Sequence, residues 1–176
     1  QLSRDWISVA ATLRNTEPSM TRRAKRKAVA RAFLEARDFS GLVGWARLER
    51  NPTGALCGLL FADDEVLRWR AVEGFGRVAA LLGEEDIESV RDVLRRILWA
   101  MNDESGGLIR NGPEVVAEVL VNVPVLVDEY VNLLPGFLHE EPFERGAAWA
   151  LARLAPLRPA ALVERASELR EALDSE

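Results

Sequence analysis

Residues 63–82 read DDEVLRWRAVEGFGRVAALL, and this stretch decides the fold class. Its apolar positions recur every three or four residues, which is the spacing of one face of an α-helix. Arg70, Glu73 and Arg77 follow the same spacing, so they share a face along which opposite charges can pair. The predicted buried stripe consists of Leu67, Ala71, Phe75, Val78 and Leu82. The pattern therefore indicates an amphipathic helix that packs on its neighbours.

The same periodicity recurs along almost the whole chain, and no segment alternates apolar and polar residues over several positions as a strand would. We therefore predict an all-α protein. Asp38, Asp63 and Asp86 are the predicted N-caps. Four prolines fall near predicted helix starts, where a missing N–H costs nothing, namely Pro52, Pro113, Pro142 and Pro159. The predicted helices cover residues 4–14, 19–36, 39–50, 53–61, 64–82, 86–101, 113–122, 126–138, 142–155 and 159–173.

Three of the predicted helices resemble one another. Residues 110–123 and 142–157 can be laid over residues 63–82 with Arg70, Asn111 and Arg145 in register, which gives spacings of 41 and 34 residues. Repeats of this length are typical of stacked helix pairs, each of which buries its apolar face only against its neighbours. The repeats predict an α-solenoid of antiparallel helix pairs in a single domain. Within it we expect basic N-terminal helices at residues 1–37, repeats at 38–157 and a capping helix at 158–176.

The second helices of these pairs carry a resemblance to a known family. RWRAVEGFGRV at 68–78 and ERGAAWALARL at 144–154 combine a charged start with alternating small and apolar positions. This pattern resembles HEAT-type repeats of the phycobilin-lyase-like class, over about residues 38–157. The resemblance implies an α-solenoid, but no lyase activity, because no surface for a tetrapyrrole is evident.

Two enzyme families with HEAT-like repeats serve as comparisons. Deoxyhypusine hydroxylases bind two irons through several His-Glu pairs, and this chain has a single such pair, His139-Glu140, which excludes that activity. Alkylpurine DNA glycosylases use a basic concave groove with aromatic residues and a carboxylate. Trp69, Trp149, Glu114 and Glu118 keep a glycosylase open as an alternative, although the C-terminal part of the chain is acidic.

The resemblance also places the candidate binding residues, because second helices usually line the concave face of a HEAT solenoid. These residues combine charges of both signs with aromatic side chains. A solvated face with mutually paired charges is the other interpretation. The candidate set is Trp69, Arg70, Glu73, Arg77, Asp103, Glu104, Arg110, Glu114, Glu118, Arg145 and Trp149.

The connection NDESGG at residues 102–107 belongs to a segment longer than the usual two to eight residues between packed helices. Asp103 and Glu104 follow a helix C-terminus, where the helix dipole disfavours carboxylates. Glu114 and Glu118 lie one turn apart and repel each other. We therefore expect cations near both pairs. The candidates are Arg70, Arg110 and Arg145 for the helix pair, and Arg95, Arg96 and Arg110 for the loop.

Composition sets the remaining limits. The chain is 48% hydrophobic and 29% charged, as expected for a soluble domain with one core. The most apolar stretch, residues 119–127, is interrupted by Asn122 and Pro124, so we expect no membrane span. The lone Cys57 precludes an internal disulfide, and no signal pattern opens the chain, so we expect a cytoplasmic protein. Positive charge gathers near the N-terminus, but the net charge of −5 argues against a nucleic-acid partner.

No catalytic constellation stands out, since His139 is isolated and neither a Ser/His/Asp order nor a Gly-rich phosphate loop is evident. We therefore predict a non-catalytic scaffold that binds a protein segment on its concave face, with no cofactor and no metal. The alternatives are a HEAT-like DNA glycosylase-type enzyme and a small-ligand or metal-binding regulatory protein.

Overall fold

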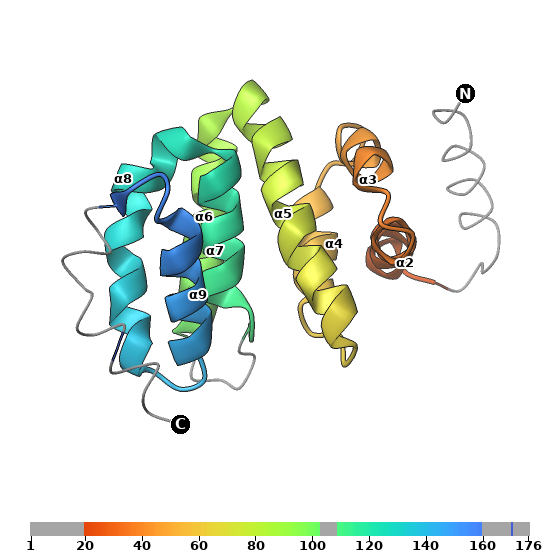
Figure 1. Cartoon of the computed structure of the whole chain (residues 1–176). Coiled ribbons are helices and arrows are strands. Elements are labelled where there is room, and N and C mark those ends of the chain that lie inside the picture. Colours follow the sequence, from red (N-terminus) through yellow and green to blue (C-terminus); the bar gives the residue numbers. More distant parts are fainter. Residues whose placement is uncertain (1–19, 103–108, 160–169, 171–176) are drawn as a thin grey trace. The chain divides into compact units, whose positions relative to one another are not determined.

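The computed structural model describes residues 20–102, 109–159 and 170. In these ranges every regular element is helical, which confirms the all-α prediction (Figure 1). The predicted helix at 4–14, the loop residues 103–108 and nearly all of the predicted final helix lie outside the described residues. No helix in the described ranges combines the length and the apolar character needed to cross a membrane.

The chain forms two compact units, residues 1–74 (unit 1) and 75–176 (unit 2). The boundary between them lies inside α5 (Glu65–Glu85). Unit 1 contains α2 (Arg22–Glu35), α3 (Phe39–Ala46), α4 (Pro52–Leu59) and the first part of α5. α2 packs against both α3 and α4.

The core of unit 1 packs closely against a glycine on α5. A Cβ on Gly74 would lie 3.0 Å from Leu42 and 3.2 Å from Leu34, both of which are fully buried. One turn earlier, Arg70 Nη1 donates to the carbonyls of Leu34 and Glu35 at 3.2 and 3.0 Å. These carbonyls lie at the C-terminal end of α2, where that of Leu34 also accepts from the backbone N–H of Arg37 at 3.1 Å, so Arg70 contributes to the C-terminal cap.

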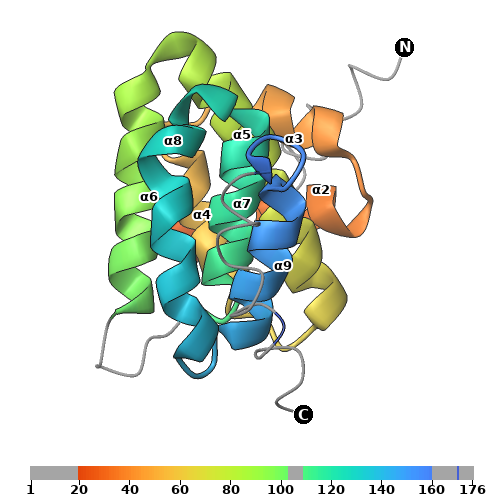
Figure 2. The same ribbon diagram turned by 60° about the vertical axis from the view of Figure 1, so that its left-hand side comes forward.

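Unit 2 contains the rest of α5, α6 (Ile87–Met101), α7 (Gly112–Asn122), a short 3₁₀ turn η1 (Pro124–Leu126), α8 (Val127–Tyr130), η2 (Val131–His139) and α9 (Glu144–Leu154). α7 packs against α6 and α9, and α9 also packs against η2 (Figures 1 and 2). All residues of α7 from Gly112 to Leu120 are buried. α7 is therefore the central helix of this unit.

The predicted helix at 126–138 was only partly correct. The chain there forms one turn of α-helix, Val127–Tyr130, followed by the 3₁₀ helix Val131–His139. Pro135 lies inside the second element and has no N–H to donate, which interrupts an α-helical ladder. α9 likewise begins at Glu144 rather than at Pro142.

Two of the three predicted N-caps are confirmed. Asp38 accepts from the backbone N–H of Gly41 at 2.8 Å, and Asp86 accepts from that of Glu88 at 3.0 Å. The third prediction was wrong by one residue, because Asp64 rather than Asp63 accepts from the N–H of Leu67 at 3.2 Å. The Asp63 carbonyl instead accepts from Arg68.

Candidate functional site

The predicted carboxylate pair lies inside unit 2, not on an open face. Glu114 is 6% exposed and Glu118 is 8% exposed. The sequence reason is that α7 is largely apolar, with residues such as Val115, Val116 and Val119, and α6 and α9 both pack onto it. The expectation that this pair forms part of an open concave surface was wrong for these two residues.

Glu114 is held by a neutral partner. Asn111 Nδ2 donates to Glu114 Oε1 at 3.0 Å. The other oxygen, Oε2, is buried and has no hydrogen-bond partner in the part of the chain that the structure describes. Burial raises the pKa of this carboxyl above its ordinary value, against a smaller opposing effect of its hydrogen bonds. Glu114 is therefore an incompletely satisfied acid in the interior of unit 2.

The carboxylate of Glu114 fits because α9 presents a glycine to it. A Cβ on Gly146 would lie 2.6 Å from Glu114 Oε2, closer than real Cβ contacts allow. Two alanines, Ala147 and Ala150, are fully buried on the same helix. Small residues on α9 thus allow the close approach of α7 and α9 at this point.

Glu118 has the cation that charge repulsion predicted, but from an unexpected residue. Arg153 Nε on α9 donates to Glu118 Oε1 at 2.7 Å, and the Glu118 side chain is only 10% exposed. Asn122 Nδ2 donates to the Glu118 carbonyl at 2.9 Å. Of the three cations considered from sequence, Arg70 instead caps α2, and the cation that the structure shows on Glu118 is Arg153.

The other predicted residues are divided between the two units. Trp69, Arg70 and Glu73 are partly exposed and lie in unit 1, whereas Arg77 is exposed and lies in unit 2. Arg110 and Arg145 are exposed and Trp149 is partly exposed, all in unit 2. Asp103 and Glu104 lie outside the described residues.

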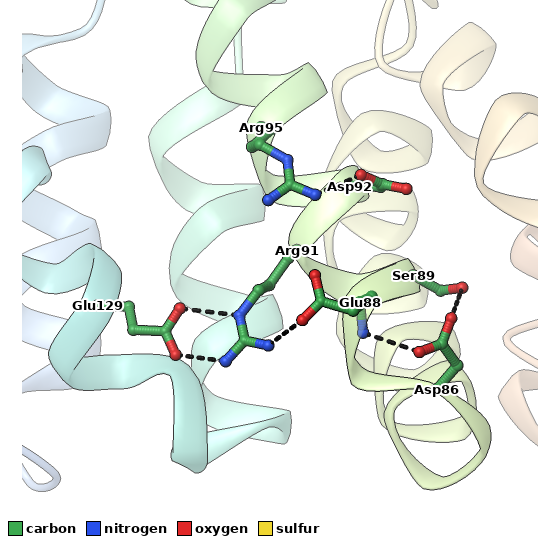
Figure 3. A network of polar contacts seen from close by, with 7 residues as sticks. All are labelled: Asp86, Glu88, Ser89, Arg91, Asp92, Arg95 and Glu129. Atoms are coloured by element: carbon green, nitrogen blue, oxygen red, sulfur yellow. Dashed lines mark hydrogen bonds and ion pairs between the residues drawn. The ribbon is translucent and has the colours of Figure 1, made fainter.

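The outer face of α6 carries a charge network that the sequence analysis missed. Figure 3 shows Arg91 between Glu88 of its own helix and Glu129 of α8. Arg91 Nε donates to Glu129 Oε2 at 2.9 Å, and these hydrogen bonds raise the pKa of Arg91 and lower the pKa of Glu129. Both side chains are partly exposed, so the pair adds modest stability and mainly fixes α6 against α8.

About two turns beyond Arg91 on α6 lies an exposed tryptophan. Trp99 is 70% exposed and lines a shallow cavity of about 660 Å³ together with Asp92, Arg95 and Arg96. Arg95 pairs with the Asp92 carboxylate, as Figure 3 shows, and Arg96 Nε donates to the Asp92 carbonyl at 3.2 Å. Positions 92, 95, 96 and 99 share one helix face, and this spacing is visible in the sequence. The sequence analysis instead treats Arg95 and Arg96 as cations for the carboxylates of the following loop.

The described ranges contain no cluster of metal ligands. No group of three or more His, Cys, Asp or Glu side chains converges there to hold a metal ion. The buried carboxylates of α7 are covered by neighbouring helices, so they are poorly placed to reach a substrate.

No family model matches the chain, and no solved structure matches it significantly. An uncharacterized protein of Archaeoglobus fulgidus is 28% identical over 128 residues, which cover 72% of this chain and 67% of the archaeal protein.

Proposed function

We propose that the chain is a non-catalytic, cytoplasmic protein-interaction module of HEAT-like helix pairs, which binds a protein segment through the outer face of α6. The observation that carries this proposal is Trp99, a large aromatic residue that is 70% exposed beside two arginines. Tryptophan and arginine are the residues most enriched among those that dominate binding energy at protein interfaces. Neighbouring helices that pack in sequence, such as α6 on α7, support the repeat architecture.

The α6 surface is prepared for binding in two ways. Asp92 restricts both Arg95 and Arg96, so less side-chain freedom is lost when a partner arrives. Arg91 and Glu129 hold the preceding turn of α6 against α8. The outer face of α6 therefore presents the Trp99 ring with two oriented guanidinium groups. This combination suits a partner segment in which an apolar side chain is flanked by carboxylates.

This proposal retains the predicted binding of a protein segment but assigns it to a different surface of the protein. The sequence placed the contact on α5, α7 and α9, but Glu114 and Glu118 of α7 are buried. Their burial also weighs against the glycosylase alternative, since a base-excising enzyme needs a carboxylate that a flipped base can reach. Trp149 and Arg145 of α9 remain on the accessible side of unit 2.

The test compares Trp99→Ala with Val125→Ala, a matched truncation of another exposed apolar residue that is 73% exposed in the same unit. Partners captured by the intact protein would be quantified for the wild type and both variants, and direct binding of the leading partner would then be measured. We expect Trp99→Ala to weaken that binding about tenfold or more, as for an interface residue worth at least 1.4 kcal/mol, and Val125→Ala to leave it unchanged. Equal binding by all three proteins would refute the assignment to α6.

A further inference from the structure

A second concave site lies within unit 1, along the first half of α2 and the segment that follows α3. It encloses about 680 Å³, within the range of 300 to 1,000 Å³ that is usual for small-molecule sites. The described residues that line it are Met20, Arg22, Lys25, Arg26, Val29, Trp45, Leu48, Glu49 and Arg50.

Among the described residues, the polar lining of this groove is mostly cationic. Four cationic side chains line it against one described carboxylate, that of Glu49. Glu49 Oε1 is already engaged, because it accepts from the backbone N–H of Arg50 at 3.0 Å and lies 2.8 Å from Arg26 Nε. Glu49 therefore neutralises one of the four cations and holds the Arg26 guanidinium in place at the groove.

The apolar part of the groove lies beside these charges. Trp45 is almost fully buried in the floor, whereas Leu48 is 73% exposed at the rim. Val29 of α2 and Met20 complete the apolar lining. An exposed leucine beside a buried tryptophan offers a place for an aromatic or aliphatic group, which water solvates poorly.

We propose that this groove binds a small organic phosphate, with the phosphate among the arginines and an apolar body against Trp45 and Leu48. Guanidinium groups match phosphate oxygens in charge and in hydrogen-bond geometry, and more than one cation favours a doubly charged group. The volume of the groove favours a small ligand, because it falls within the range that is usual for small-molecule sites. The proposal is independent of the α6 surface, which belongs to unit 2.

The test uses the full chain, labelled with ¹⁵N, and three probes: phenyl phosphate, inorganic phosphate and phenol. Phenyl phosphate should shift the Trp45 indole signal and the amide signals of α2 saturably, with a Kd below about 1 mM. Each half of the probe should bind at least about tenfold more weakly, since it makes only part of the contacts. Arg50→Gln should weaken phenyl phosphate binding about tenfold, as should Arg26→Gln if that variant folds.

Arg23→Gln is the matched control, because Arg23 is exposed on the same helix and does not line the groove. Loss of binding in Arg23→Gln equal to that in Arg50→Gln would overturn the proposal, since it would show attraction to general positive charge. Equal affinity for inorganic and phenyl phosphate would overturn the role of the apolar floor. Shifts at the groove with an acidic peptide, and none with phenyl phosphate, would overturn the ligand class in favour of a protein segment.

Discussion

Replacing Glu114 with glutamine should change how the stability of the protein depends on pH. Glutamine has the same shape and can still accept the hydrogen bond from Asn111, but it cannot ionise. The wild-type carboxyl is 6% exposed, and one of its oxygens has no hydrogen-bond partner among the described residues. Comparing the two proteins therefore isolates the cost of placing a negative charge in the interior.

The sign follows from the raised pKa of Glu114 in the folded state. Between the ordinary pKa and the raised pKa, the folded protein keeps a proton that the unfolded chain has already released. The free energy of unfolding of the wild type therefore falls as the pH rises through this window, and then stays level above the raised pKa. A buried oxygen without a hydrogen bond costs about 1 to 3 kcal/mol, which sets the scale of the loss.

Urea denaturation of the wild type and Glu114→Gln, from about pH 4 to about pH 8, measures this loss as the difference between the two stability curves. The difference cancels the titration of the other carboxylates, which both proteins share. Relative to the variant, the wild type should lose about 1 to 3 kcal/mol towards high pH. The control is Glu140→Gln, which removes an exposed carboxylate in the same unit. The stability curve of this variant should run parallel to that of the wild type.

Two results would refute the reasoning. Parallel curves for the wild type and Glu114→Gln would mean that the carboxylate is as well solvated in the folded state as in the unfolded chain. A wild type that gains stability relative to the variant as the pH rises would mean that a cation compensates the charge, as the sequence analysis first supposed.

Four further substitutions test the packing, charge pairing and capping of the helices. Gly76→Ala would place a Cβ 2.7 Å from the Glu118 carbonyl and should lower the free energy of unfolding by about 1 to 3 kcal/mol. Gly44→Ala is the control, because a Cβ there meets nothing within 4 Å, and it should raise the free energy of unfolding by about 0.5 to 1 kcal/mol. Chemical denaturation of both variants measures the two changes. Arg153→Ala should cost about 1 to 2 kcal/mol at neutral pH, because it leaves the Glu118 carboxylate buried without its cation, and a loss near zero in the same assay would show that the pair is solvent-screened. Asp86→Ala removes the N-cap of α6 and should lower the denaturation midpoint. Hydrogen bonds from Ser89 and Glu88 lower the pKa of Asp86, so the difference from wild type should vanish as the pH falls through that pKa. A difference that stays constant with pH would contradict the cap assignment.

The elements of this fold were largely predictable because they depend on local patterns. The 3.6-residue periodicity predicted α5, α6 and α7 to within a few residues of their observed bounds. Caps such as Asp38 are local as well, since the side chain reaches a backbone N–H only three residues away. The 3₁₀ helix Val131–His139 escaped prediction, because its apolar spacing fits an α-helix and only Pro135 signals the difference.

The candidate site was less predictable because it depends on which faces of a helix are covered. Glu114 and Glu118 look solvent-facing in a sequence, yet α7 is packed on both sides and both carboxylates are buried. Repulsion between them correctly indicated a cation, but its source, Arg153, lies 35 residues away on α9. Pairing across helices depends on their mutual orientation, which helical periodicity does not determine.

The contact between Gly146 and Glu114 couples two positions that lie far apart in the chain. A Cβ at position 146 would occupy the space of the Glu114 carboxylate, so a relative with alanine or serine there must either move this buried side chain or carry a shorter residue at position 114. Conversely, a relative that keeps glutamate at 114 should keep glycine at 146. The two positions should therefore change together as homologues diverge, and this paired signature can identify distant members of the lineage when overall identity has become too low.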